Sequence, residues 1–119
     1  MRIAIPVDEK NIDSNVCMSF GRAPYYLIFD TDTDESEFVV NTAATSAGGA
    51  GIRAAQIVAD QKVDVLLTPR CGQNAAEVIQ AANIKLYKTS GTSIKDNIDA
   101  MKAGTLSPLD EIHAGLHGH

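Results

Sequence analysis

Apolar strand segments alternate with amphipathic helix segments through the second half of the chain, and this order constrains the fold most. A buried strand pattern at 63–68 runs into the turn Pro69-Arg70-Cys71-Gly72, and a helical pattern follows. The predicted strands lie at 2–7, 25–30, 37–41, 63–68 and 84–88, and the predicted helices at about 50–61, 75–82 and 94–103. Strands joined through helices pair in parallel, whereas the first three are joined without helices. The sequence therefore predicts an α/β protein with three layers, α/β/α, around a mixed five-stranded sheet.

Apolar spacing also predicts which side of each helix faces the sheet. The predicted buried residues are Ile52, Ala55, Val58 and Ala59 in the first helix, Ala75, Val78, Ile79 and Ala82 in the second, and Ile94, Ile98 and Met101 in the third. Ser93 and Asp96 have the spacing of a capping box, and Gly104 is a typical helix stop. Pro6 has no N–H to donate, so we expect the first strand to end or bulge there.

Length and charge exclude several classes of protein. The chain has 119 residues and a net charge of −5, and its basic residues are scattered, which argues against nucleic-acid binding. We find no apolar run long enough to span a membrane and no secretion signal, so we expect a cytoplasmic protein. In that setting the two cysteines are expected to be free thiols or ligands.

The pattern of ordered segments ends near Gly104. We therefore predict one ligand-binding domain over residues 1–104 and a flexible tail over residues 105–119. The tail contains all three histidines, His113, His117 and His119, which are candidate metal ligands. The interspersed glycines argue against a stable helix that would hold them on one face.

Three arginines stand beside glycine-containing turns. Arg70 precedes a predicted helix start, where free backbone N–H groups favour anions. Arg22 and Arg53 occupy two further loops that a mixed sheet could bring to the same edge, although each could instead be a surface residue or local cap. The loop at 48–51 contains three glycines but matches neither common nucleotide motif, so it indicates a nucleotide site only weakly. The alternative is that the backbone passes close to a neighbouring group, where only small side chains fit.

Cys71 is open to three interpretations. At a helix start its pKa should be lowered, which would suit a nucleophile or a metal–sulfur contact. A nucleophile would need a base, and no histidine lies outside the tail. The third interpretation is an inert residue in a packed turn. Cys17 stands in another irregular loop that could reach the same site.

Four blocks of the sequence resemble one known family. Residues 2–7 (RIAIPV), 20–26 (FGRAPYY), 49–51 (GAG) and 72–75 (GQNA) are similar to the dinitrogenase iron–molybdenum cofactor biosynthesis family, in the same order and without a large gap up to about residue 104. The resemblance implies a ribonuclease H-like fold and a small protein that carries or stores an anionic metal–sulfur cluster of the Fe-Mo or Mo-Cu sulfide type, bound non-covalently.

The resemblance, together with the loop chemistry, predicts a cluster-binding set. Its members are Met18, Phe20, Gly21, Arg22, Gly48, Gly49, Gly51, Arg53, Arg70, Cys71, Gly72 and Asn74. The chain departs from the family at Ser19, where many relatives have histidine, and at Cys71, where many have a hydrophobic residue. The first departure weakens a histidine-ligated iron cluster, and the second leaves a thiolate contact open.

Three hypotheses about function follow. The first is a non-catalytic carrier of a molybdenum-containing cluster, with a possible acceptor or regulatory protein as partner. The second is a regulatory or interaction module with an anion pocket. The third is an enzyme that attacks a small anion through Cys71, which the missing base disfavours.

Overall fold

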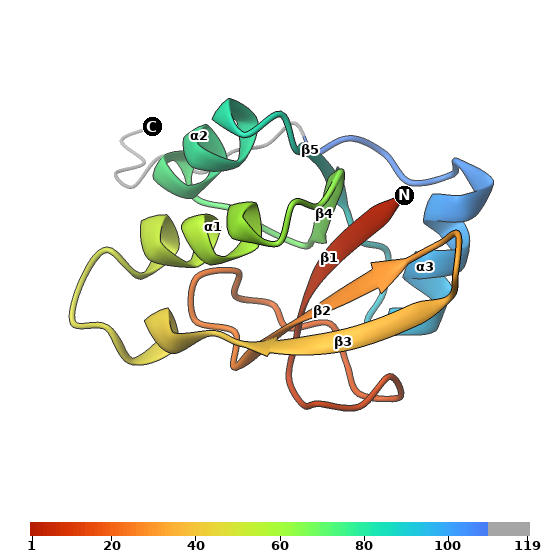
Figure 1. Cartoon of the computed structure of the whole chain (residues 1–119), viewed down its shortest axis with the longest axis horizontal. Coiled ribbons are helices and arrows are strands. Elements are labelled where there is room, and N and C mark those ends of the chain that lie inside the picture. Colours follow the sequence, from red (N-terminus) through yellow and green to blue (C-terminus); the bar gives the residue numbers. More distant parts are fainter. Residues whose placement is uncertain (110–119) are drawn as a thin grey trace.

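The computed structural model describes residues 1–109 and contains five strands, three α-helices and one short 3₁₀ helix in that part of the chain (Figure 1). The strands are β1 (Arg2–Val7), β2 (Tyr25–Asp30), β3 (Glu35–Val40), β4 (Val65–Thr68) and β5 (Lys85–Lys88). The helices are η1 (Thr42–Thr45), α1 (Ala50–Asp60), α2 (Gln73–Ala81) and α3 (Ile94–Ala103). Over this range no helix has the length and apolar character needed to cross a membrane.

The five strands form one mixed sheet in the order β3-β2-β1-β4-β5. β1 is central: it pairs antiparallel with β2, with Ile3 opposite Phe29, and parallel with β4, with Ile3 beside Val65. β4 and β5 are also parallel. The predicted fold, with an antiparallel part followed by two strand–helix–strand units, is confirmed.

Alternating strand residues build a separate core on each face of the sheet. Ala4, Leu66 and their neighbours pack under α1 and α2, and Ile3, Leu67 and their neighbours pack under α3. Figure 1 shows the first two helices together on one side of the sheet and α3 on the other. These are the three predicted layers.

Some local expectations were wrong. β1 does not end at Pro6, because its pairing with β4 covers only Ile3 and Ala4, so the missing N–H removes no bond to that strand. Pro6 pairs with Tyr26 of β2 instead, and the strand continues to Val7. The hairpin is also tighter than predicted, since β3 begins at Glu35 rather than Glu37.

The buried faces of the first two helices are rotated from the predicted ones. α1 buries Ala50, Ala54, Ala55 and Val58, whereas Ile52 is exposed and Ala59 is half-buried. α2 ends before Ala82, which is exposed and caps the helix, and Val78 is half-buried. Both helices contain many alanines, so apolar spacing alone did not fix their rotation. In α3 the predicted Ser93 cap accepts from the Asp96 N–H, and Gly104 ends the helix.

Residues 105–109, assigned from the sequence to the tail, lie along β5. The Leu109 N–H donates to the Leu86 carbonyl at 3.0 Å, and the Lys88 N–H donates to the Ser107 carbonyl at 2.9 Å. Leu109 is buried. The predicted histidine ligands His113, His117 and His119 lie outside the described residues.

Candidate functional site

One hollow of about 610 Å³ opens where the loop at 16–24 meets the first turns of α1 and α2. The three segments together supply cationic side chains, apolar side chains and backbone groups to the hollow. Its lining residues are Met18, Ser19, Phe20, Gly21, Arg22, Gly49, Ala50, Gly51, Ile52, Arg70, Cys71, Gly72, Gln73, Asn74 and Ala75. Among residues 1–109, no aspartate or glutamate lines the hollow, although the whole chain contains 15 such residues. The hollow is called the anion pocket below.

Two helix N-termini face the anion pocket without side-chain caps. α1 begins after Gly49, which has a left-handed φ of 68°, and α2 begins after Gly72; neither residue offers a side chain to the first turn. The first N–H groups of a helix have no carbonyl partner within it and carry a partial positive charge. Because α1 and α2 pack together, both sets of donors lie at one site.

The loop at 16–24 fits closely against α1. A Cβ built at Gly21 would lie 3.1 Å from both the backbone N and Cα of Gly51, which is tighter than side chains normally pack. Glycine at position 21 therefore lets the two backbones form adjoining walls of the pocket. A Cβ at Gly51 would meet only the Ala75 Cβ, at an ordinary 3.6 Å.

Asn41, which lies outside the pocket, holds this loop from behind. The side chain is only 3% exposed, and its Nδ2 donates to the carbonyls of Gly21 at 3.1 Å and Ala23 at 2.8 Å. Its Oδ1 accepts from the Ala43 N–H at the start of η1. One amide thus joins the loop at 16–24 to the segment that leads into α1.

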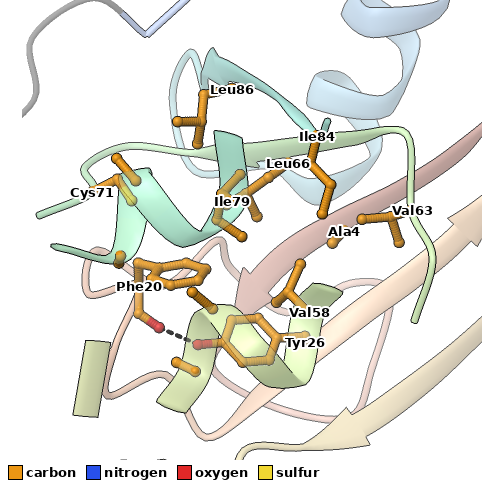
Figure 2. Close-up of a cluster of buried hydrophobic side chains, with 14 of the residues drawn as sticks. Ala4, Phe20, Tyr26, Val58, Val63, Leu66, Cys71, Ile79, Ile84 and Leu86 are labelled. Atoms are coloured by element: carbon orange, nitrogen blue, oxygen red, sulfur yellow. Dashed lines mark hydrogen bonds between the residues drawn. The ribbon is translucent and has the colours of Figure 1, made fainter. Parts of the chain in front are cut away.

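Tyr26 supports the same loop from the core. Its hydroxyl donates to the Phe20 carbonyl, as Figure 2 shows, and the two aromatic rings pack with centroids 5.4 Å apart. Burial raises the pKa of Tyr26, so the hydroxyl stays a donor. Phe20 is itself 4% exposed and lines the pocket.

The three predicted arginines do not share one role. Arg22 and Arg70 are exposed and line the pocket, whereas Arg53 and Gly48 are outside its lining. The Arg22 Nη1 donates to the carbonyls of Ala44 at 2.9 Å and Ser46 at 3.1 Å, so this guanidinium also anchors the glycine-rich loop. A guanidinium has five N–H donors, so Arg22 keeps further donors that a ligand can use.

The turn that carries Arg70 is held from the sheet. The buried Thr68 hydroxyl, at the end of β4, donates to the Arg70 carbonyl at 2.9 Å. This bond fixes the backbone between the strand and α2 while the Arg70 side chain stays in solvent.

Cys71 differs from the sequence-based expectation. The residue is 1% exposed and belongs to the same core cluster as Phe20 (Figure 2), and burial raises its pKa to about 11 instead of lowering it. At neutral pH the thiol of the free protein is protonated. Burial also raises the pKa of Cys17, with a smaller contribution from Asp8, and Cys17 does not line the pocket.

The Cys71 pKa predicts a loss of stability at alkaline pH. The folded-state pKa lies above the ordinary value of 9.0, so its contribution is fully present below pH 9 and is lost as the pH rises towards 11. Urea unfolding of the wild type and Cys71→Ala should show their stability difference shrinking by about 1 kcal/mol between pH 7 and pH 10. Cys17 and Tyr26 are present in both proteins, so their contributions to the pH dependence cancel in the difference. A constant difference would show that Cys71 is not buried as described.

Ten of the twelve predicted cluster-binding residues line the anion pocket, and five lining residues were not predicted. The five are Ser19, Ala50, Ile52, Gln73 and Ala75. All five lie next to predicted residues in the chain, and four of them could have been included by proximity alone. Ile52 was missed because its spacing had assigned it to the core. Nothing in the sequence pattern singled out Asn41, whose role depends on tertiary contacts.

Comparison with known proteins assigns the chain to a family. Residues 1–104 match the family model described as "Dinitrogenase iron-molybdenum cofactor". The chain is similar to the apo form of the orange protein from Desulfovibrio gigas, with 32% identity, a TM-score of 0.87 and 92% of each chain covered.

Two further proteins are similar over nearly their whole length. A Thermotoga protein of the DUF35 family has 34% identity and a TM-score of 0.83, with 97% of this chain and 98% of that chain covered. An uncharacterized protein of Methanocaldococcus jannaschii is 27% identical over 113 residues, which are 92% of each chain. The sheet order and helix placement are those of the predicted ribonuclease H-like fold. The chain belongs to the dinitrogenase iron–molybdenum cofactor family.

Proposed function

We propose that this protein is a non-catalytic carrier of an anionic, molybdenum-containing metal–sulfur cluster, which it binds reversibly in the anion pocket and passes to an acceptor protein. The observation that carries the proposal is the charge of the pocket. Two arginines and two uncapped helix N-termini line it, and no carboxylate of residues 1–109 does, in a chain of net charge −5. Such a site attracts an anion that the rest of the surface repels.

The size and lining of the pocket fit a cluster rather than a single small ion. A volume of about 610 Å³ lies in the usual range for small-molecule sites. Guanidinium and backbone N–H groups can donate to the sulfides at the edge of a cluster without occupying a metal coordination position. Phe20 and Met18 add apolar contact. The family name and the orange protein support an Fe-Mo or a Mo-Cu sulfide composition.

Non-covalent binding is supported by the donor groups on hand. Residues 1–109 contain no group of three or more His, Cys, Asp or Glu side chains that could hold a metal ion. The pocket's thiol, Cys71, is protonated in the free protein, and within the described part of the chain the lining has no carboxylate or histidine that could act as a base. The same facts support a binding role over Cys-dependent catalysis.

Reconstitution tests the proposal. The purified chain is mixed with tetrathiomolybdate and a copper salt, or with an iron salt, then desalted and examined by visible spectroscopy and metal analysis. We expect a coloured protein that retains molybdenum in a fixed ratio to protein. A colourless protein without molybdenum after desalting would contradict the proposal.

A control separates the pocket from the histidines. In the triple variant His113→Ala, His117→Ala and His119→Ala, copper bound without thiomolybdate should decrease, because histidine imidazoles bind this metal. Retained molybdenum should be unchanged. Loss of molybdenum in this variant would place the cluster at the tail instead.

A further inference from the structure

Two of the three large hydrophobic side chains exposed on residues 1–109 line the anion pocket. Met18 is 60% exposed and Ile52 is 38% exposed, and the third, Val40, lies on β3 outside the pocket. Exposed apolar side chains that gather at one hollow mark a binding surface, whereas single ones are ordinary. The pocket therefore offers both charge and apolar surface to the same ligand.

The polar donors cannot by themselves select a sulfur-containing ligand. Arg22, Arg70 and the helix N–H groups attract any anion, and oxygen accepts their hydrogen bonds at least as well as sulfur does. Phosphate, sulfate and molybdate are oxyanions that would compete for the same donors. A protein that carries a thiometallate needs another wall that rejects oxygen-surfaced anions.

Met18 and Ile52 provide such a wall. An oxyanion pressed against a thioether and an aliphatic chain would lose water from its oxygens and gain no hydrogen bond, which is unfavourable. A sulfide surface is larger, more polarizable and more weakly hydrated, so the same contact costs it little. Methionine sulfur is itself polarizable and adapts to irregular partners.

We propose that Met18 and Ile52 are specificity-determining residues, which make the anion pocket select sulfur-surfaced over oxygen-surfaced anions of the same charge. This inference rests on the proposed function, because it concerns the same pocket. It goes further because it assigns two separate roles. The arginines attract anions in general, and the two apolar side chains determine which anion is bound.

Tetrathiomolybdate and molybdate are the appropriate probes. Both are tetrahedral dianions of the same metal, and they differ only in the outer atoms. Removing roughly 50 Å² of apolar surface from water corresponds to about tenfold in affinity. By calorimetric titration the wild type should therefore bind tetrathiomolybdate at least about tenfold more tightly than molybdate.

The double variant Met18→Gln/Ile52→Gln should lose most of this preference. Glutamine is close in size to both side chains and supplies a polar group, so tetrathiomolybdate affinity should fall about tenfold while molybdate affinity stays the same or rises. Val40→Gln is the matched control, because it changes the remaining exposed hydrophobic residue away from the pocket. It should leave both affinities within about twofold of the wild type.

The outcomes separate this inference from the proposed function. If the wild type binds both anions equally, or the double variant loses both affinities by the same factor, the two residues do not select and the inference is overturned. If the wild type binds tetrathiomolybdate neither alone nor with a metal salt, the proposed function itself fails. If the ratio of tetrathiomolybdate affinity to molybdate affinity changes in Met18→Gln/Ile52→Gln and not in Val40→Gln, the result supports both the inference and the proposed function.

Discussion

Asn41→Ala is expected to lower the free energy of unfolding by about 2–4 kcal/mol, since each buried acceptor that loses its donor costs about 1–3 kcal/mol. The Asn41 amide donates to the Gly21 and Ala23 carbonyls, and its oxygen accepts from the Ala43 N–H. Alanine can replace none of these bonds. Urea unfolding followed by circular dichroism measures the loss.

The same substitution should also damage the anion pocket. Asn41 fixes the loop that presents Gly21 and Arg22, so we expect tetrathiomolybdate affinity to fall about tenfold or more in protein that is still folded. Asn97→Ala is the matched comparison. Asn97 is 1% exposed and its amide group bonds to the Ser90 N–H and carbonyl, on the face of the sheet covered by α3.

Asn97→Ala should lose a similar amount of stability, because it also leaves buried polar groups without partners, and should retain ligand affinity. If both variants lost affinity equally, the effect would follow from general destabilisation and not from the loop. If Asn41→Ala cost less than about 1 kcal/mol, the amide would not be a significant clamp.

The order of elements was predictable from the sequence because each strand and helix carries a local signal. The β-branched and apolar runs, the Ser93 cap and Gly104 all act within a few residues of where they stand. The rotation of α1 was not predictable in the same way. Alanine is found in cores and on surfaces alike, so the rotation of α1 is fixed by its packing against the sheet. That packing places Ala54 in the core and Ile52 at the pocket.

The site was predictable where glycine and arginine mark turns, and less so where tertiary packing decides. Gly21 and Arg22 stand out in sequence, and the structure places both in the pocket. Arg53 also stands close to glycines in the sequence, yet it lies in the first turn of α1, at a position outside the pocket lining. Asn41 acts across 18 and 20 residues of chain, a distance over which no local pattern operates.

Cys71 shows how two local rules can conflict. A helix start lowers a thiol pKa, and burial raises it. The sequence revealed the first effect only, and the 1% exposure of the side chain makes the second prevail. The pocket therefore offers a neutral thiol, and its attraction for an anion comes from the arginines and the backbone.

Removing an arginine of the pocket should therefore have a large effect on ligand binding. Arg70→Ala is expected to weaken tetrathiomolybdate binding by about tenfold to a hundredfold, because a hydrogen bond to a charged group contributes about 1.5–3 kcal/mol. Arg22→Ala should be at least as damaging, since Arg22 also anchors the carbonyls of Ala44 and Ser46. Equilibrium dialysis at low salt measures both.

Arg53→Ala makes the same change in net charge outside the pocket, so it separates a specific contact from long-range attraction. Its affinity should stay within about twofold to threefold of the wild type, and this small loss should vanish near 0.5 M salt, where screening is strong. The losses in Arg22→Ala and Arg70→Ala should persist there, because direct contacts are screened less. Equal losses in all three variants would mean that the overall charge of the surface, and not the anion pocket, holds the ligand.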